Sequence, residues 1–132
     1  MSPLEGTAVA DRPAHDGETE DAELIRRANE LVERGWSRTA LALDAAGRQV
    51  EPWSEQARRW SLLGALLEAW YEQGLRDGDA FLVAYTALAF ATGGRVEEWN
   101  AARWRTRRHV LAAFPRARGF LPSARAYVRS HR

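Results

Sequence analysis

The chain has 132 residues, of which 45% are hydrophobic and 28% charged, a composition typical of one soluble globular domain rather than of a disordered or fibrous protein. It contains no cysteine. This excludes disulfide bonds and thiolate chemistry, and it leaves His, Asp and Glu as the side chains that a metal site would need.

The formal net charge of +1 hides an uneven distribution of charge. Residues 1–94 hold 9 Arg against 16 Asp and Glu, whereas residues 95–132 hold 10 Arg against two Glu, and lysine is absent throughout. Such a separation produces a field that attracts a partner of opposite sign, and nucleic acid and an acidic protein surface are both such partners. The alternative is that the two halves pair with each other, within one chain or between two copies.

The first seventeen residues contain neither a basic start nor an apolar run, so the sequence predicts no secretory signal. We expect a disordered leader over residues 1–18, a single helical domain over residues 19–132 and a cytoplasmic location. The most apolar stretch, residues 80–91, has about 12 residues, fewer than the roughly 20 that a membrane-spanning helix needs. We therefore expect no membrane segment.

The first predicted helix spans residues 20–34. Its first turn is acidic, which suits the positive end of the helix dipole, and Gly35 is a natural helix end. Its apolar residues recur at the spacing of one helical face, at Leu24, Ile25, Ala28, Leu31 and Val32.

Residues 36–53 predict a short β-hairpin or an extended arm. Their D-A-A-G turn places Asp44 first, where the carboxylate can accept from the backbone, and Gly47 last, where a positive φ is needed. A second helix is predicted from Ser54, as its N-cap, to about Gln73. Its apolar stripe consists of Trp60, Leu63, Leu67, Trp70 and Tyr71.

The third predicted helix covers residues 80–92, with Asp79 as its N-cap and the pair Gly93 and Gly94 at its end. This segment is apolar nearly all round, so we expect it at the centre of the fold.

The fourth predicted helix begins near Thr106, and Pro115 disturbs its regular pattern. The last spans residues 122–130, with Tyr127 and Val128 docked on the core. The predicted fold class is mainly α, a compact bundle of about five helices with one short β-hairpin or extended arm.

The basic segment E-W-N-A-A-R-W-R-T-R-R-H-V, residues 98–110, contains the candidate site. If Thr106 caps the fourth helix, Arg107 and Arg108 lie in its first turn, where the backbone already carries unpaired N–H groups and partial positive charge. Arginine is unfavourable there unless a negative group joins it, so the segment predicts a site for an anion or an acidic partner. The predicted binding residues are Asn100, Arg103, Arg105, Thr106, Arg107, Arg108 and His109. The alternative is internal pairing with Glu97, Glu98 or the acidic first helix.

The chain has six tryptophans. Trp60 and Trp70 fall on a helical stripe and are most simply part of the core. Trp99 and Trp104 lie in the basic segment, where they stack either on nucleobases or against their own arginines through cation–π contacts, and we favour the second.

Enzyme motifs of the metalloprotease, P-loop, dinucleotide-binding and serine-hydrolase kinds are absent from the sequence. His109 is the histidine best placed for acid–base work, and a single histidine is a weak basis for a catalyst. Glu68 and Glu72, one helical turn apart, could chelate a metal, but a solvated helix face is favoured. Asp77 and Asp79 lack the further oxygen ligands of a calcium loop. We predict no catalytic residue, no metal and no cofactor.

Three runs of the chain resemble a family of uncharacterised small domains from bacteria and phages. They are W-S-R-T-A-L-A-L-D-A-A-G-R-Q-V-E-P-W (36–53), A-R-R-W-S-L-L-G-A-L-L (57–67) and E-W-N-A-A-R-W-R-T-R-R-H-V-L-A-A-F (98–114). The positions that match the family's pattern are Trp36, Asp44, Gly47, Arg48, Trp60, Gly64, Trp99, Asn100, Arg105 and Thr106.

The chain departs from that pattern at three positions. Ser37 and Ser61 stand where the family often has cysteine, and Ala101 stands where it has an aspartate. The resemblance implies a shared fold and no known activity, and the departures weaken any function that depends on those cysteines or that aspartate.

These observations favour a non-catalytic binding module whose basic C-terminal third engages an acidic partner or nucleic acid. A small-molecule binder or small enzyme with an arginine-lined anion pocket is the alternative, because no catalytic constellation is complete. A homo-oligomer, in which the acidic first helix of one copy meets the basic end of another, is a third hypothesis.

Overall fold

The computed structural model describes residues 18–132, so all but the last residue of the predicted leader lie outside the described part. That part is mainly helical with one small antiparallel sheet, which confirms the predicted fold class. Its elements are α1 (Glu20–Arg34), β1 (Ala42–Leu43), β2 (Arg59–Trp60), α2 (Leu62–Glu72), α3 (Gly78–Thr92), α4 (Val96–Ala101), α5 (Arg107–Gly119) and α6 (Leu121–Ser130). The short helix α4 was not predicted.

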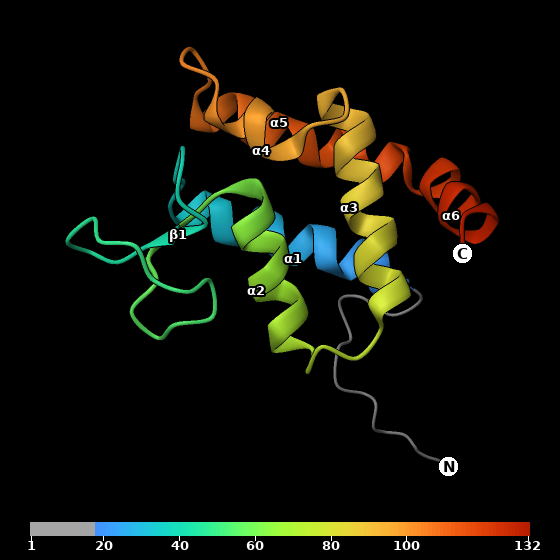
Figure 1. The fold of residues 1–132 in the computed structure, drawn as a ribbon, viewed down its shortest axis with the longest axis horizontal. Coiled ribbons are helices and arrows are strands. Elements are labelled where there is room, and N and C mark those ends of the chain that lie inside the picture. Colours follow the sequence, from blue (N-terminus) through green and yellow to red (C-terminus); the bar gives the residue numbers. More distant parts are fainter. Residues whose placement is uncertain (1–17) are drawn as a thin grey trace.

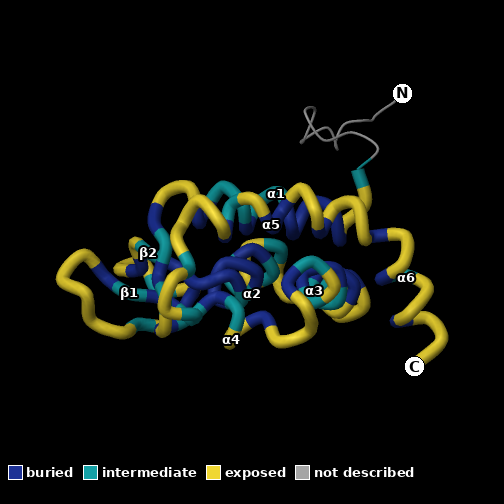
Figure 2. The backbone as a smooth tube through the Cα atoms, turned by 90° about the horizontal axis from the view of Figure 1, so that it is seen from above, coloured by how far each residue is buried: buried dark blue, intermediate teal, exposed yellow. Residues whose placement is uncertain are grey.

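The helices form two layers. α1 and α5 lie side by side in one layer, and α2 and α3 cross beneath them (Figures 1 and 2). α1 and α5 run antiparallel, since Arg107 in the first turn of α5 bonds to Glu33 near the end of α1, and Arg118 near the end of α5 bonds to Ala22 near the start of α1. The start of α5 therefore lies beside the end of α1.

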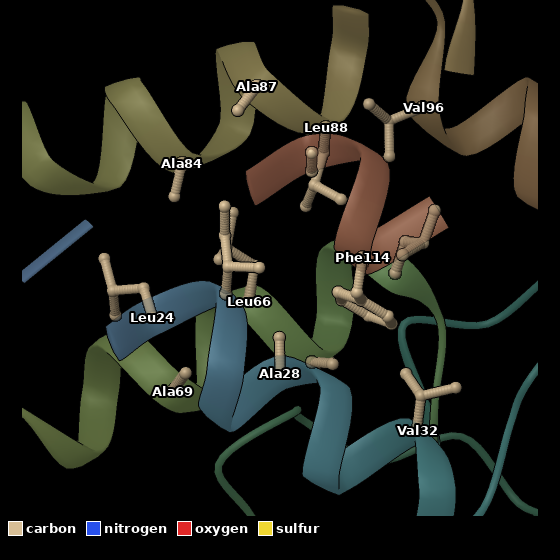
Figure 3. Close-up of a cluster of buried hydrophobic side chains, with 14 of the residues drawn as sticks. Leu24, Ala28, Val32, Leu66, Ala69, Ala84, Ala87, Leu88, Val96 and Phe114 are labelled. Atoms are coloured by element: carbon tan, nitrogen blue, oxygen red, sulfur yellow. The ribbon is translucent and has the colours of Figure 1, made fainter. Parts of the chain in front are cut away.

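The core lies between these layers. α1 contributes Leu24 and Ala28, α2 contributes Leu66, α3 contributes Leu88, and α5 contributes Phe114, all of them buried (Figure 3). Burial of such side chains stabilises the fold by roughly 1.5–3 kcal/mol each. The buried residues of each of these helices recur at helical spacing, so each helix turns one face toward the core.

α1 matches its predicted bounds. The Thr19 hydroxyl accepts from the backbone N–H of Ala22, and the chain leaves the helix at Gly35. The predicted turn is also confirmed, because the Asp44 carboxylate accepts from the backbone of Ala46 and Arg48 and Gly47 has φ of 82°.

The strand that leads into this turn pairs differently from the simple hairpin expected over residues 36–53. A single bridge, Leu43 to Gln49, closes the turn. β1 forms its ladder with β2 instead, with Ala42 opposite Trp60.

The second helix was predicted to start too early. α2 begins at Leu62 with Ser61 as its N-cap, whereas Ser54 accepts from the backbone of Gln56 in a turn. After this turn, residues 58–60 do not form a helix because their backbone bonds go elsewhere: Arg58 N donates to Leu43 and Trp60 N donates to Gly35.

The predicted apolar stripe of α2 was therefore wrong as well. Its buried face is Leu62, Gly64, Ala65, Leu66 and Ala69. Trp60 is in the core as predicted, but it belongs to β2. The indole N–H of Trp60 donates to the Pro52 carbonyl at 2.9 Å.

α3 also differs from its prediction. Asp77, not Asp79, is its N-cap, accepting from Ala80 N at 3.0 Å. The helix is not buried all round, because Leu82 and Phe90 on its outer side are exposed. Gly93 ends the helix with φ of 90°, as the predicted glycine pair requires.

Pro115 does not end the fourth predicted helix. α5 continues through Pro115 to Gly119, because Phe114 and Ala117 on either side of the proline are buried against the core. α6 follows almost at once, and its Val128 is buried whereas Tyr127 is exposed and meets Phe90 edge-on.

Candidate basic surface

The loop between α4 and α5, residues 102–106, lies at one end of the molecule, at the upper left in Figure 1, and α6 lies at the opposite end. The end of α1 is its neighbour, because the Arg107 guanidinium donates to the Glu33 carbonyl at 3.2 Å. A cation at the last carbonyls of a helix complements the negative end of the helix dipole.

Asn100, one of the predicted binding residues, is buried, with 1% of its surface exposed. Its Oδ1 accepts from the Trp36 indole at 2.9 Å and from Leu62 N at 3.2 Å. Its Nδ2 donates to the carbonyls of Ser37 at 3.0 Å and Arg38 at 2.7 Å. These bonds use the whole hydrogen-bonding capacity expected of an amide in such a site, so Asn100 joins α4, α2 and residues 36–38 rather than facing solvent.

Two tryptophans beside Asn100 are each covered by an arginine. The Arg105 guanidinium lies 3.8 Å from the ring centre of Trp99, and its Nε donates to the Trp99 carbonyl at 2.7 Å. This confirms the cation–π alternative for Trp99. Burial lowers the pKa of Arg105, and the nearby Arg116 lowers it further.

The second of these pairs was missed in the sequence. The Arg38 guanidinium lies 5.0 Å from the ring centre of Trp36 and donates to the carbonyl of Ala102. The W-S-R order of residues 36–38 was a usable signal for a local stack. The contact of Arg38 with the loop of residues 102–106 could not be predicted in this way, because Ala102 lies 64 residues further along the chain.

Thr106 caps α5 as predicted. Its hydroxyl accepts from His109 N at 3.3 Å, and Nδ1 of His109 accepts from Thr106 N at 3.2 Å, which completes a capping box with histidine in the place usually taken by Glu or Gln. The Nδ1 atom of His109 therefore serves the helix start.

The remaining predicted residues face solvent. Arg103, Arg107 and Arg108 are exposed, as is Trp104, with 71% of its surface accessible. Within residues 18–132 none of these arginines has a carboxylate within ion-pair distance, and the first turn of α5 holds no acidic residue. We call Arg103, Trp104, Arg107 and Arg108 the basic surface.

Several other C-terminal arginines form ion pairs within the molecule, as expected from the alternative of internal pairing. Arg118 bonds to Glu18 at 2.9 Å and Arg125 bonds to Asp21 at 2.9 Å, so the acidic start of α1 takes up charge from α5 and α6. Of the two late glutamates, Glu98 pairs with Arg95 at 3.0 Å, and burial raises the pKa of Glu97. The pairs of Arg118 and Arg125 thus lie at the end of the molecule opposite to the basic surface, whereas the Arg95–Glu98 pair lies at α4.

Residues 16–120 match the Family of unknown function (DUF6197). The chain belongs to this family. No curated protein and no solved structure matches the chain. Membership in DUF6197 supports the resemblance to an uncharacterised small-domain family and assigns no activity to any residue.

The other candidate groups of this DUF6197 chain serve the fold. Asp77 caps α3. Asp79 pairs with Arg132 at 2.6 Å. No group of three or more His, Cys, Asp or Glu residues in the described part is arranged to hold a metal. None of the helices over residues 18–132 has the length and apolarity to cross a membrane.

Glu68 and Glu72 do not form the solvated helix face that was favoured. Glu72 binds Arg27 of α1 through both carboxylate oxygens, at 2.7 and 3.0 Å. Glu68 is half-buried beside it, and burial together with the Glu72 carboxyl raises the pKa of Glu68 to about 8. The two carboxyl groups therefore lie at the contact between α1 and α2.

Proposed function

We propose that the chain is a non-catalytic binding module and that its basic surface binds nucleic acid. The observation that supports this most is the contrast between the two ends of the molecule. Arg118 and Arg125 pair with carboxylates of α1, whereas Arg103, Arg107 and Arg108 have no carboxylate partner among the described residues and stand beside the exposed ring of Trp104.

Phosphate fits this surface on electrostatic grounds. Guanidinium groups donate paired hydrogen bonds to phosphate oxygens, and the first turn of α5 adds partial positive charge beneath Arg107 and Arg108. A row of phosphates can offer each exposed arginine a phosphate of its own. Binding then gains from the release of condensed counterions at each neutralised phosphate.

An arginine-lined pocket for a small anion has less support. The pocket predicted from the sequence consists of Asn100, Arg105, Arg107 and His109, and three of these four side chains are engaged elsewhere in the structure. Asn100 is buried with its amide in use, Arg105 covers Trp99, and Nδ1 of His109 belongs to the capping box of α5. A ligand at this place would have to compete with those contacts.

The test is the affinity of the purified chain for fluorescently labelled DNA and RNA, measured by anisotropy over a series of salt concentrations. We expect binding that weakens as salt rises, with a slope in log Kd against log salt of about 0.7 to 0.9 for each phosphate neutralised. R103Q/R108Q should weaken binding by about tenfold or more and reduce the slope by about one to two. Neither Arg103 nor Arg108 makes a side-chain hydrogen bond or an ion pair within residues 18–132, so the double variant should not disturb the fold.

The matched control is R76Q/R129Q, which removes the same charge from two other exposed arginines outside the basic surface. We expect it to retain most of the affinity. Equal loss in the two double variants would show a general charge effect and contradict a defined surface. Binding to polyglutamate but to neither DNA nor RNA would assign the surface to an acidic protein instead.

A further inference from the structure

Three tryptophans lie in or beside the loop of residues 102–106, which we call the basic loop. Within the described residues, an arginine covers the ring of two of them. Arg38 lies over Trp36 and Arg105 lies over Trp99. Trp104 has neither a ring partner nor a guanidinium over it in residues 18–132, and 71% of its surface is exposed. Moving a large apolar side chain out of water is favourable by about 1.5–3 kcal/mol. The uncovered ring of Trp104 is therefore suited to a partner with a flat face.

The backbone presents this ring on a braced turn. Arg105 N donates to the Ala102 carbonyl at 2.9 Å, which places Arg103 and Trp104 at the two central positions of a four-residue turn. Arg38 bonds to the same Ala102 carbonyl, and Arg105 is held against Trp99. Both ends of the turn are thus tied to the protein, which lowers the entropy that Trp104 would lose on binding.

We propose that Trp104 stacks on an unpaired nucleobase and that the ligand of the basic surface is single-stranded nucleic acid. This inference rests on the proposed function, since Arg103 and Arg108 supply the phosphate contacts. Bases within a duplex are already stacked on both faces, so a surface ring finds a free base only in a single strand. Stacking of aromatic side chains on bases tolerates any sequence, because every base has a π face.

The experiment compares W104A, W104F and the unchanged chain in binding three ligands: a single strand, the same strand in a duplex, and an abasic single strand with the same number of phosphates. We expect the unchanged chain to prefer the intact single strand. W104A should lose about tenfold in affinity for it, and W104F should retain most of the affinity. The abasic strand should bind the unchanged chain about as weakly as the intact strand binds W104A.

W53A is the matched control, because Trp53 is also exposed, at 42%, but is stacked on Tyr71 away from the basic loop. Its affinity for the single strand should not change. The salt dependence of W104A should equal that of the unchanged chain, since no charge is removed, whereas R103Q/R108Q should reduce it.

The outcomes separate this inference from the proposed function. Suppose that R103Q/R108Q weakens binding, that W104A does not, and that the abasic strand binds as tightly as the intact one. The role of the basic surface would then be retained and the stacking of Trp104 would be wrong. A duplex that binds as tightly as the single strand would also overturn the stacking. Absence of binding by the unchanged chain to all three ligands would overturn both.

Discussion

The amide of Asn100 bonds α4 to groups from two other segments of the chain. It accepts from the Trp36 ring and from Leu62 N at the start of α2, and it donates to the carbonyls of Ser37 and Arg38. A buried polar group of this kind is costly to leave unpaired, at about 1–3 kcal/mol for each orphaned partner. Asn100 therefore ties α4 to the start of α2 and to residues 36–38.

Asn100→Ala should lower the free energy of unfolding by about 2–4 kcal/mol, because it leaves buried donors and acceptors without partners. Urea unfolding at neutral pH measures this change. Asn29→Ala is the control, since Oδ1 of Asn29 is buried without a hydrogen-bond partner in the described part of the chain. A loss for Asn29→Ala as large as that for Asn100→Ala would contradict the role given to the Asn100 bonds.

Glu68 predicts a pH dependence of stability. Burial and the neighbouring Glu72 carboxyl raise the pKa of Glu68 to about 8 from its ordinary 4.5. Between these values the folded state holds a proton that the unfolded state has released, so this group makes stability fall as pH rises from 4.5 to 8.

Glu68→Gln removes that titration and keeps the shape of the side chain. We expect it to stabilise the protein by about 1–2 kcal/mol more at pH 8.5 than at pH 5.5. Glu30→Gln, at a more exposed partner of Arg27, is the comparison and should show a smaller difference between these pH values. Thermal unfolding at both pH values decides the matter, and an equal effect of Glu68→Gln at both would contradict the raised pKa.

At the scale of elements, the first turn of α2 lies against the backbone of Leu41, directly before β1. A Cβ on Gly64 would lie 1.8 Å from the Leu41 carbonyl oxygen. The same carbonyl accepts from Ser61 N at 3.1 Å, so the backbone there is held and cannot move aside cheaply. Glycine at 64 is therefore required by close approach of two backbones.

Gly64→Ala should destabilise the fold by about 3 kcal/mol or more, since the added methyl group overlaps backbone rather than a flexible side chain. Gly78→Ala is the matched control in the first turn of α3, where a Cβ meets nothing within 4 Å. That change should be neutral or stabilising by up to about 1 kcal/mol. Comparison of the two midpoints of urea unfolding tests the close approach, which equal midpoints would exclude.

The elements that the sequence predicted well are those with a local cause. Helix α1 has an N-cap, an acidic first turn and a clear apolar face, and the turn at Asp44 has its own side-chain bonds. The start of α2 was missed because Arg59 and Trp60 form a strand of two residues, too short for any periodicity. Nearly all of α2 is apolar, so its pattern did not distinguish the buried face.

The candidate site divides in the same way. The Thr106 cap and the stack of Arg105 on Trp99 arise from residues close in sequence and were foreseen as such. The burial of Asn100 was not, because its partners lie in other segments, from 38 to 64 residues away. Local spacing cannot report a contact of that range.

Over the whole molecule, the antiparallel packing of α1 against α5 explains how a chain of nearly zero net charge keeps a basic surface. The acidic start of α1 lies beside the end of α5 and α6, where Arg118 and Arg125 neutralise Glu18 and Asp21. The start of α5 meets the other end of α1, where Arg107 finds a carbonyl of Glu33 and no carboxylate in the described chain. Charge is thus cancelled at one end and left at the other.

Arg125→Gln tests this division. Burial opposes ionisation of Asp21, but hydrogen bonds from Arg125 and Thr19 outweigh it and hold the pKa of Asp21 below its ordinary 3.8. A lowered pKa contributes stability that is present above 3.8 and is lost as pH falls through the folded value. Arg125→Gln should therefore cost about 1–3 kcal/mol at pH 7, and the cost should shrink as Asp21 is protonated below pH 4.

Arg129→Gln, at an exposed position four residues further along α6, should change stability little at either pH, because its guanidinium has no carboxylate partner within residues 18–132. Nucleic-acid affinity supplies the second measurement on the same two variants. Arg125 acts at the neutralised end, so Arg125→Gln should bind nucleic acid about as tightly as the unchanged chain while it is less stable. If it instead weakened binding as much as R103Q/R108Q does, the two ends would not be independent, and the net charge of the whole chain rather than the basic surface would govern association.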